Sequence, residues 1–171
     1  MRRDKYHESY FLDIDGALNL DKYFDKLSNL DIQGIEKEID IEKVKLLKEA
    51  INETGAKIVL SSSWRYTKKG QQLKELLSNY EIYVESTPFI QNERGLEIKQ
   101  WLSEDQCIED FVILDDEVFD SYDDVLTKKL VKISNGNGHS YGEGLLPRDV
   151  KEIIKRLGRK KEKNEINQEL E

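Results

Sequence analysis

The sequence predicts an α/β domain in which a mainly parallel sheet lies between two layers of helices. Short apolar runs rich in β-branched residues recur along the chain, and segments with helical spacing of apolar residues separate them. Strands that alternate with helices form parallel sheets, because each parallel connection needs a crossover. The length of 171 residues suits one domain with a substantial core.

Composition narrows the class of protein. The formal net charge of −8 argues against a surface that binds nucleic acid everywhere, although a local basic face is compatible with it. No apolar run reaches the roughly 18 residues that cross a bilayer, and the charged start lacks the apolar segment of a secretory signal. Cys107 is the single cysteine, so no internal disulfide can form. We therefore expect a cytoplasmic protein that has no membrane partner.

The elements of the first half follow from local patterns. The stretch Tyr-Phe-Leu-Asp-Ile-Asp-Gly at 10–16 predicts a short apolar strand that ends at a sheet edge and turns at Gly16. An irregular, charged connection is expected over 17–40. A helix then runs from Asp40, which suits an N-cap, to Gly55, which suits a terminator. The run Lys-Ile-Val-Leu at 57–60 predicts a buried strand.

The second half repeats the alternation. Further strands are expected at 82–84, 111–114 and 130–133, and further helices at 71–80, 93–103 and 147–157. The glycine-rich stretch 135–139 lacks the Lys and Ser/Thr spacing of a P-loop and indicates a turn. Residues 1–158 form the predicted domain, and 159–171 form a charged, solvent-facing tail.

Three of the predicted strands end in polar residues. Asp13 and Asp15 lie at the end of the first strand and on the same side of it, because side chains alternate with period two. The second strand ends in three serines at 61–63, and the fourth ends in Asp115 and Asp116. Ligands of parallel sheets bind outside the carboxyl ends of the strands. If these strands are neighbours, the carboxylates and hydroxyls share one crevice.

This set of side chains points to phosphoryl chemistry. Four carboxylates in one pocket repel one another unless a hard divalent cation such as Mg²⁺ joins them. Hydroxyls and backbone N–H groups at a strand end can bind the oxygens of a phosphoryl group. Each Asp-Gly or Asp-Asp site taken alone is also compatible with a simple turn.

Four motifs occur in an order that resembles the haloacid dehalogenase (HAD) superfamily. They read Phe-Leu-Asp-Ile-Asp-Gly at 11–16, Ile-Val-Leu-Ser-Ser-Ser-Trp-Arg at 58–65, Arg-Gly-Leu-Glu-Ile-Lys-Gln-Trp-Leu at 94–102, and Val-Ile-Leu-Asp-Asp at 112–116. More narrowly, the sequence is similar to the HAD domain of Swiss Army Knife RNA repair proteins, from about residue 10 to 157. The resemblance implies a three-layer, Rossmann-like HAD fold with a minimal cap or none.

The resemblance also implies roles for the acidic residues. Asp13 would be the nucleophile and Asp15 the general acid and base. The Asp13 carboxylate, the Asp15 backbone carbonyl, Asp115 and Asp116 would hold Mg²⁺.

The phosphate-binding residues remain open between candidates. Either Ser61 or Ser62 would bind a phosphate oxygen, and the position of Trp64 slightly favours Ser62. The family's basic residue would be Arg94, with Lys99 as the second candidate.

Two neighbours of the serines have simpler interpretations. Arg65 lies just beyond the serines and could guide a polyanionic substrate. Trp64 is expected to pack rather than to stack on bases.

Two functional hypotheses follow. The first is a Mg²⁺-dependent phosphatase that works through an aspartyl-phosphate, on a phosphorylated substrate such as a nucleic-acid or nucleotide end. The second is a HAD-like domain that binds phosphate or a partner without catalysis. Only 17–40 can hold a cap, so an open site is expected. The sequence leaves the oligomeric state undetermined.

Overall fold

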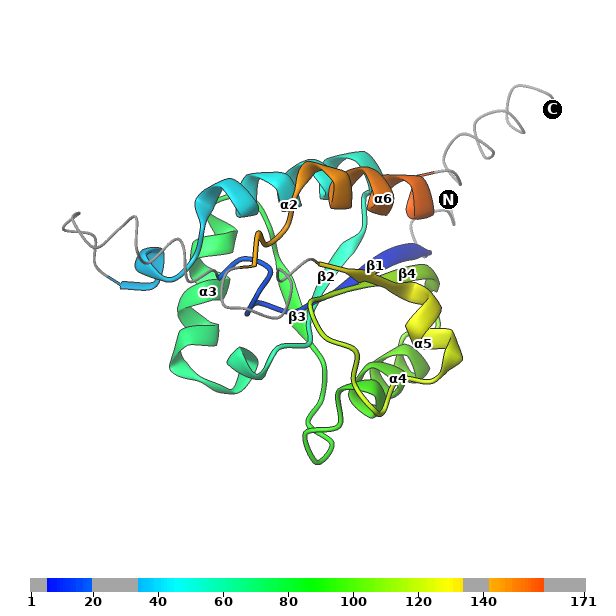
Figure 1. The fold of residues 1–171 in the computed structure, drawn as a ribbon. Coiled ribbons are helices and arrows are strands. Elements are labelled where there is room, and N and C mark those ends of the chain that lie inside the picture. Colours follow the sequence, from blue (N-terminus) through cyan, green and yellow to red (C-terminus); the bar gives the residue numbers. More distant parts are fainter. Residues whose placement is uncertain (1–5, 20–33, 134–141, 159–171) are drawn as a thin grey trace, which may run out of the picture.

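Five parallel strands form one sheet in the computed structural model, which describes residues 6–19, 34–133 and 142–158 (Figure 1). The strands are β1 (His7–Leu12), β2 (Lys57–Leu60), β3 (Val84–Ser86), β4 (Ile108–Asp115) and β5 (Leu130–Lys132). Their order is β3-β2-β1-β4-β5, and each neighbouring pair is parallel. The predicted α/β fold with a parallel sheet is confirmed, and β1 is the central strand.

Helices cover both faces of the sheet. They are α2 (Ile41–Thr54), α3 (Lys68–Ser78), α4 (Arg94–Glu104), α5 (Asp124–Lys129) and α6 (Pro147–Leu157), with short 3-10 turns η1 (Gly34–Lys37) and η2 (Ser63–Tyr66). One buried cluster joins the sheet to α2, α3 and α6, and a second joins it to α4 and α5. Figure 1 shows α2 and α6 on one side of the sheet and α4 and α5 on the other.

Strand β1 is buried on both faces. Tyr10 and Leu12 belong to the cluster on the α2 and α6 side, and Phe11, between them, belongs to the cluster on the α4 and α5 side. The Phe11 ring meets Trp101 of α4 edge-on, with 5.5 Å between centroids. Contacts on both faces therefore fix the end of β1 in space.

Local signals set most helix boundaries as expected. The Asp40 side chain accepts a hydrogen bond from the backbone N–H of Glu42 at 3.0 Å, and Gly55 ends α2 in the left-handed region at φ +70°. Helix α3 begins three residues earlier than predicted, because the Thr67 hydroxyl accepts from the backbone N–H of Gly70. Strand β3 begins two residues later than predicted, after a turn in which Glu81 has φ +57°.

Three short elements had no sequence prediction, and one of them is η1, which lies in the connection expected to be irregular. Helix α5 has six residues and a single buried position, Leu126, so it shows no apolar repeat. The turn η2 has four residues. Most of the expected connection at 17–40, the turn at 135–139 and the tail at 159–171 lie outside the described residues.

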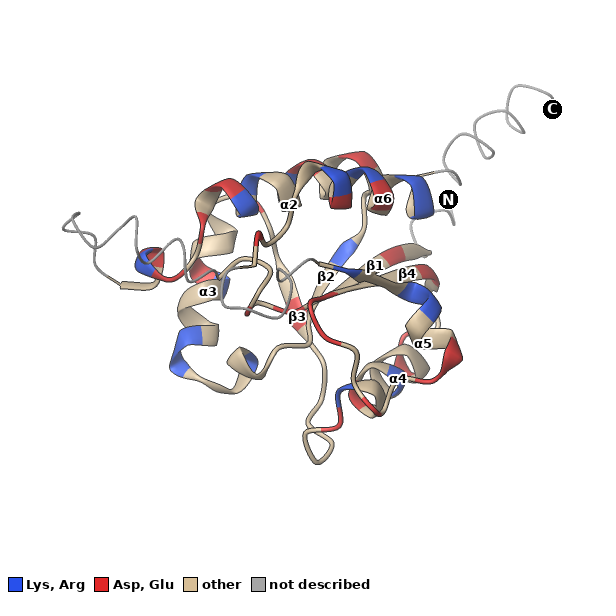
Figure 2. Cartoon of the chain, viewed as in Figure 1, with Lys and Arg blue, Asp and Glu red and all other residues tan. Residues whose placement is uncertain are grey.

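The charged side chains are mixed on the outer helices and acidic near the strand ends. Figure 2 shows both signs interspersed along α2 and α6, and acidic residues in the segment that follows β4. Within the described ranges, no helix has the length and apolar character needed to cross a membrane.

Candidate active site

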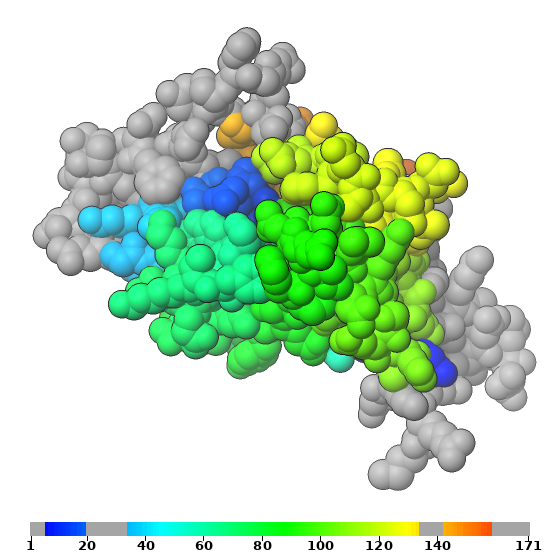
Figure 3. Space-filling model, turned by 90° about the horizontal axis from the view of Figure 1, so that it is seen from below, coloured from blue at the N-terminus to red at the C-terminus, as the bar shows by residue number. Residues whose placement is uncertain are grey.

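The three polar strand ends lie side by side, as the sequence predicts for neighbouring strands. Strand β1 pairs with β2 and with β4, and Leu12 is in register with Leu60 and with Leu114. The backbone N–H of Asp13 donates to the Leu114 carbonyl at 2.9 Å, and that of Ser61 donates to the Leu12 carbonyl at 3.0 Å. On the surface, the segments that follow β1, β2 and β4 meet the start of α4 (Figure 3).

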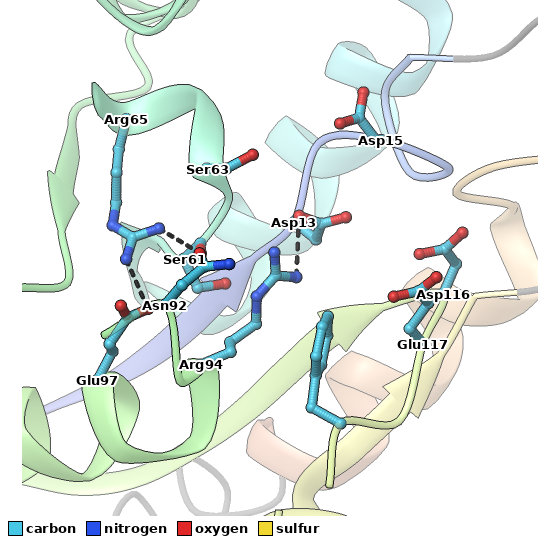
Figure 4. A pocket seen from close by; sticks show the side chains of 11 residues that line it. Asp13, Asp15, Ser61, Ser63, Arg65, Asn92, Arg94, Glu97, Asp116 and Glu117 are labelled. Atoms are coloured by element: carbon cyan, nitrogen blue, oxygen red, sulfur yellow. Dashed lines mark hydrogen bonds and ion pairs between the residues drawn. The ribbon is translucent and has the colours of Figure 1, made fainter. Parts of the chain in front are cut away.

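A cavity of about 290 Å³ opens at this edge of the sheet (Figure 4). Most of the side chains that line it are charged or polar: Asp13, Asp15, Ser61, Ser63, Arg65, Asn92, Arg94, Glu97, Asp116, Glu117 and Phe119. Its lining comes from the three strand ends, from η2 and from the start of α4. The architecture thus brings together residues as far apart in the chain as Asp13 and Phe119, which are 106 positions apart.

Three carboxylates form a compact cluster in and beside this cavity. Asp13, Asp115 and Asp116 each offer an oxygen, and these oxygens lie within 4.8 Å of one another. Gly16 makes room for the cluster, since a Cβ there would stand 2.3 Å from a carboxylate oxygen of Asp116, and its φ of +78° also favours glycine. The Asp15 carboxylate lies outside the cluster and is exposed.

Arg94 is the cation that faces this cluster. Its guanidinium lies 3.0 Å from Asp13 Oδ1 and 2.5 Å from Asp115 Oδ2, and it rests 4.4 Å from the Phe119 ring centroid. Lys99, the second candidate for the basic role, instead pairs with Asp123 at 2.6 Å and does not line the cavity. The structure therefore places Arg94 in the site and Lys99 outside it.

Burial and charge act on the ionisation of this pair. Burial raises the pKa of Asp13 to about 7; Arg94 opposes the shift, while Asp115, Asp15 and Asp116 add to it. Burial alone would lower the pKa of Arg94, but the two adjacent carboxylates outweigh it and the pKa is raised. The pKa of Asp13 thus lies near neutral pH, so small changes in its surroundings alter the charge of its carboxyl group.

The serines at the end of β2 divide into two roles. The buried Ser61 hydroxyl lines the cavity and has no hydrogen-bond partner among the described residues. The Ser62 hydroxyl accepts from the backbone N–H of Trp64 at 3.3 Å and so caps η2. The slight sequence preference for Ser62 as the cavity serine differs from this arrangement, because the hydroxyl of Ser62 is used by the turn.

Arg65 links the end of β2 to α4 through hydrogen bonds and a buried ion pair. Its guanidinium donates to the carbonyls of Ser61 and Ser62 at 2.8 and 2.7 Å and pairs with Glu97 at 2.6 Å, where both side chains are 2% exposed. Glu97 also accepts from the backbone N–H of Ile90 at 3.0 Å. The expectation that Arg65 guides a substrate is not supported by this geometry, because its donors are bound to protein groups.

Sequence reasoning missed the two residues that hold Asp15. The Trp64 indole N–H donates to Asp15 Oδ2 at 3.1 Å, and the Asn19 amide donates to Asp15 Oδ1 at 3.2 Å. The expected packing role of Trp64 is confirmed, since its ring belongs to the buried cluster under α2 and α3. A tryptophan directly after a polar strand end was the available signal, whereas no pattern pointed to Asn19.

The side chains at this edge have the chemistry that suits a divalent cation and a phosphoryl group. Carboxylate oxygens are ligands that Mg²⁺ prefers, and a free hydroxyl and a guanidinium suit phosphate oxygens.

A family model described as the HAD domain in Swiss Army Knife RNA repair proteins matches residues 10–140. No curated protein and no solved structure matches the chain.

Proposed function

This chain belongs to the family of HAD domains in Swiss Army Knife RNA repair proteins, and we propose that it is a Mg²⁺-dependent phosphomonoester hydrolase. The observation that carries the proposal is the setting of Asp13. It ends the central strand, is 5% exposed, and lies between a guanidinium and two further carboxylates. A buried carboxylate at such a position suits attack on a phosphorus atom whose oxygens are neutralised nearby.

The donor set fits a hard cation. Asp13, Asp115 and Asp116 would hold Mg²⁺, and the family implies a further ligand in the backbone carbonyl of Asp15. When bound, the ion neutralises charge on the phosphoryl oxygens and polarises the phosphorus.

The protein's own residues account for the remaining steps. Asp13 attacks phosphorus to form an aspartyl-phosphate, and the bond from phosphorus to the leaving oxygen breaks. Asp15 gives that oxygen a proton. Asp15 then takes a proton from water, which attacks the aspartyl-phosphate, so that inorganic phosphate leaves and the Asp13 carboxylate is restored. The Ser61 hydroxyl and Arg94 bind the phosphoryl oxygens throughout.

The family description supports a substrate class. It places this domain type in RNA repair proteins, so we propose that the phosphate removed is at the end of a nucleic acid or nucleotide. The Ser61 hydroxyl and the Arg94 guanidinium would contact only the phosphate, so they suit a terminal phosphate on either RNA or DNA.

The test compares the wild-type protein with Asp13→Asn. Hydrolysis of p-nitrophenyl phosphate and of RNA and DNA with 3′- or 5′-phosphates is measured with Mg²⁺ and with EDTA. We expect turnover to require Mg²⁺ and to fall by roughly a thousandfold or more in the variant, because the nucleophile is lost. Asp105→Asn is the matched control, since Asp105 pairs with His7 and does not line the cavity.

Two results would count against the proposal. Unchanged turnover in Asp13→Asn would exclude the aspartyl-phosphate route. Mg²⁺ binding by the wild-type protein without hydrolysis of any substrate would favour the alternative of a non-catalytic binding domain.

A further inference from the structure

We propose that Trp64 is a positioning residue that holds the Asp15 carboxylate at the mouth of the cavity, in place to protonate the leaving oxygen. The inference rests on the proposed phosphatase function. The Trp64 indole N–H donates to Asp15 Oδ2 at 3.1 Å, between residues 49 positions apart. An indole N–H can only donate, so a largely buried tryptophan needs an acceptor in a fixed place.

Trp64 is a rigid support for this bond. Its side chain is 8% exposed and packs in the main buried cluster. The Thr67 hydroxyl and backbone N–H both donate to the Trp64 carbonyl, at 2.7 and 2.9 Å. At Gly70 an added Cβ would stand 2.1 Å from the same carbonyl oxygen, so α3 approaches Trp64 as closely as the backbone permits. These contacts fix the backbone of Trp64 between η2 and α3, and packing in the buried cluster confines its ring.

Asp15 needs such a support because its carboxylate is exposed. An exposed side chain on a loop samples several rotamers, and ordering it has an entropic cost. Trp64 donates to Oδ2 and Asn19 donates to Oδ1 at 3.2 Å, so each oxygen has one donor among the residues that the structure describes. A carboxylate has about four lone-pair sites, so acceptor capacity remains for a proton or a leaving group.

The direction of the reaction agrees with this placement. Asp13 is 5% exposed at the base of the cavity, whereas Asp15 is exposed and lines the same cavity (Figure 4). In phosphoryl transfer the leaving oxygen departs opposite the nucleophile. The leaving oxygen therefore departs toward the mouth of the cavity, where Trp64 positions the Asp15 carboxyl group.

The kinetic test uses two leaving groups with Trp64→Phe. The aryl substrate, p-nitrophenyl phosphate, releases a resonance-stabilised phenolate that needs no proton, whereas an alkyl phosphate releases an alkoxide oxygen that does. We expect kcat/KM for the alkyl phosphate to fall about tenfold more than kcat/KM for the aryl phosphate, because kcat/KM reports formation of the aspartyl-phosphate, where only the alkyl leaving oxygen needs the acid. Hydrolysis of the aspartyl-phosphate, in which Asp15 acts as the base, is common to both substrates. Trp101→Phe is the matched control, since Trp101 is also 8% exposed but packs against Phe11 on the opposite face.

A second variant separates positioning from folding. Asn19→Ala removes the donor to the other Asp15 oxygen without touching the core, and we expect a smaller loss with the same dependence on leaving group. Equal losses of kcat/KM for both substrates in Trp64→Phe and in Asn19→Ala would overturn the inference. Thermal unfolding of each variant, followed by circular dichroism, shows whether it is folded.

Fluorescence reports the contact independently of activity. In the Trp101→Phe background Trp64 is the remaining tryptophan, and we expect Asp15→Ala to shift its emission maximum. An unchanged maximum would overturn the contact. If Asp15→Ala itself shows no dependence on leaving group, the proposed acid role of Asp15 fails. If Asp15→Ala shows it and Trp64→Phe does not, the inference about Trp64 alone fails.

Discussion

Asp13 stands between opposing electrostatic influences. Burial and the nearby carboxylates favour its neutral form, while Arg94, 3.0 Å away, favours the charged form. The result is a pKa of about 7, far above that of an exposed aspartate. A buried carboxylate of this kind costs folding free energy whenever it is ionised, so its presence favours a functional over a structural role.

Asp13→Asn should stabilise the metal-free protein at pH 8. The pKa of Asp13 rises from 3.8 in its unperturbed state to about 7 in the folded protein, so the folded state binds the proton more tightly. The contribution of Asp13 to the free energy of unfolding therefore falls as pH rises from about 4 to about 7. Asn lacks this penalty, so the variant should gain on the order of 1 kcal/mol or more at pH 8 and little at pH 4.

Urea denaturation in EDTA at both pH values measures this difference. The control is Asp105→Asn. Burial would raise the pKa of the native Asp105 carboxyl, but its hydrogen bond from the backbone of Cys107 and its contact with His7 lower that pKa in the folded protein. That variant should lose stability at pH 8. A pH-independent effect of Asp13→Asn would contradict the raised pKa.

Elements hold the site through bonds between distant segments. The Arg65 and Glu97 pair joins the end of β2 to α4 and, through Ile90, to the loop before α4. Both charged side chains are 2% exposed, so each depends on the other for compensation. The same helix α4 carries Arg94 at its first turn, so this ion pair sets where Arg94 meets Asp13.

Glu97→Gln should lower the free energy of unfolding by about 3–5 kcal/mol, because it leaves the guanidinium of Arg65 buried without a counter-charge. Glu42→Gln is the matched control. Glu42 pairs with Lys45 at 2.8 Å, but its side chain is 75% exposed, so we expect a change below about 0.5 kcal/mol. Denaturant titration of both variants measures the contrast, and equal effects would refute the structural role of the buried pair.

Local and distant interactions explain what the sequence could predict. The bounds of α2 follow from Asp40 and Gly55, whose effects extend over a few residues. The convergence of the strand ends follows from alternation and parallel topology, both visible as patterns. The bond between Trp64 and Asp15 joins two loops and depends on the path of η2, which no local pattern encodes. The use of Ser62 as a cap depends on the same turn.

At the scale of the whole molecule, strand order decides which side chains meet. The order β2-β1-β4 places the carboxyl ends of three strands at one edge, and two helical layers bury β1 between them. Neighbouring parallel strands thus bring Asp13 and Asp115 together, although they are far apart in the chain. The stability of the whole domain is therefore linked to whatever neutralises this edge.

Mg²⁺ should raise the unfolding midpoint of the wild-type protein. A ligand that binds only the folded state stabilises it by about 2.7 kcal/mol at a hundredfold excess over Kd. Asp116→Asn should reduce this gain, because it removes one carboxylate of the cluster with Asp13 and Asp115. Glu117→Gln removes the same charge from the next residue, which lines the cavity but does not belong to the cluster, so the gain should persist.

Thermal unfolding with EDTA and with increasing Mg²⁺ measures these gains. Potassium chloride at matched ionic strength separates binding from screening, because a screened surface responds to both salts alike. Equal gains in the wild type and in both variants would show that Mg²⁺ does not bind through the cluster. A gain that only Asp116→Asn loses would instead locate the ion at the carboxyl ends of β1 and β4, where the proposed nucleophile lies.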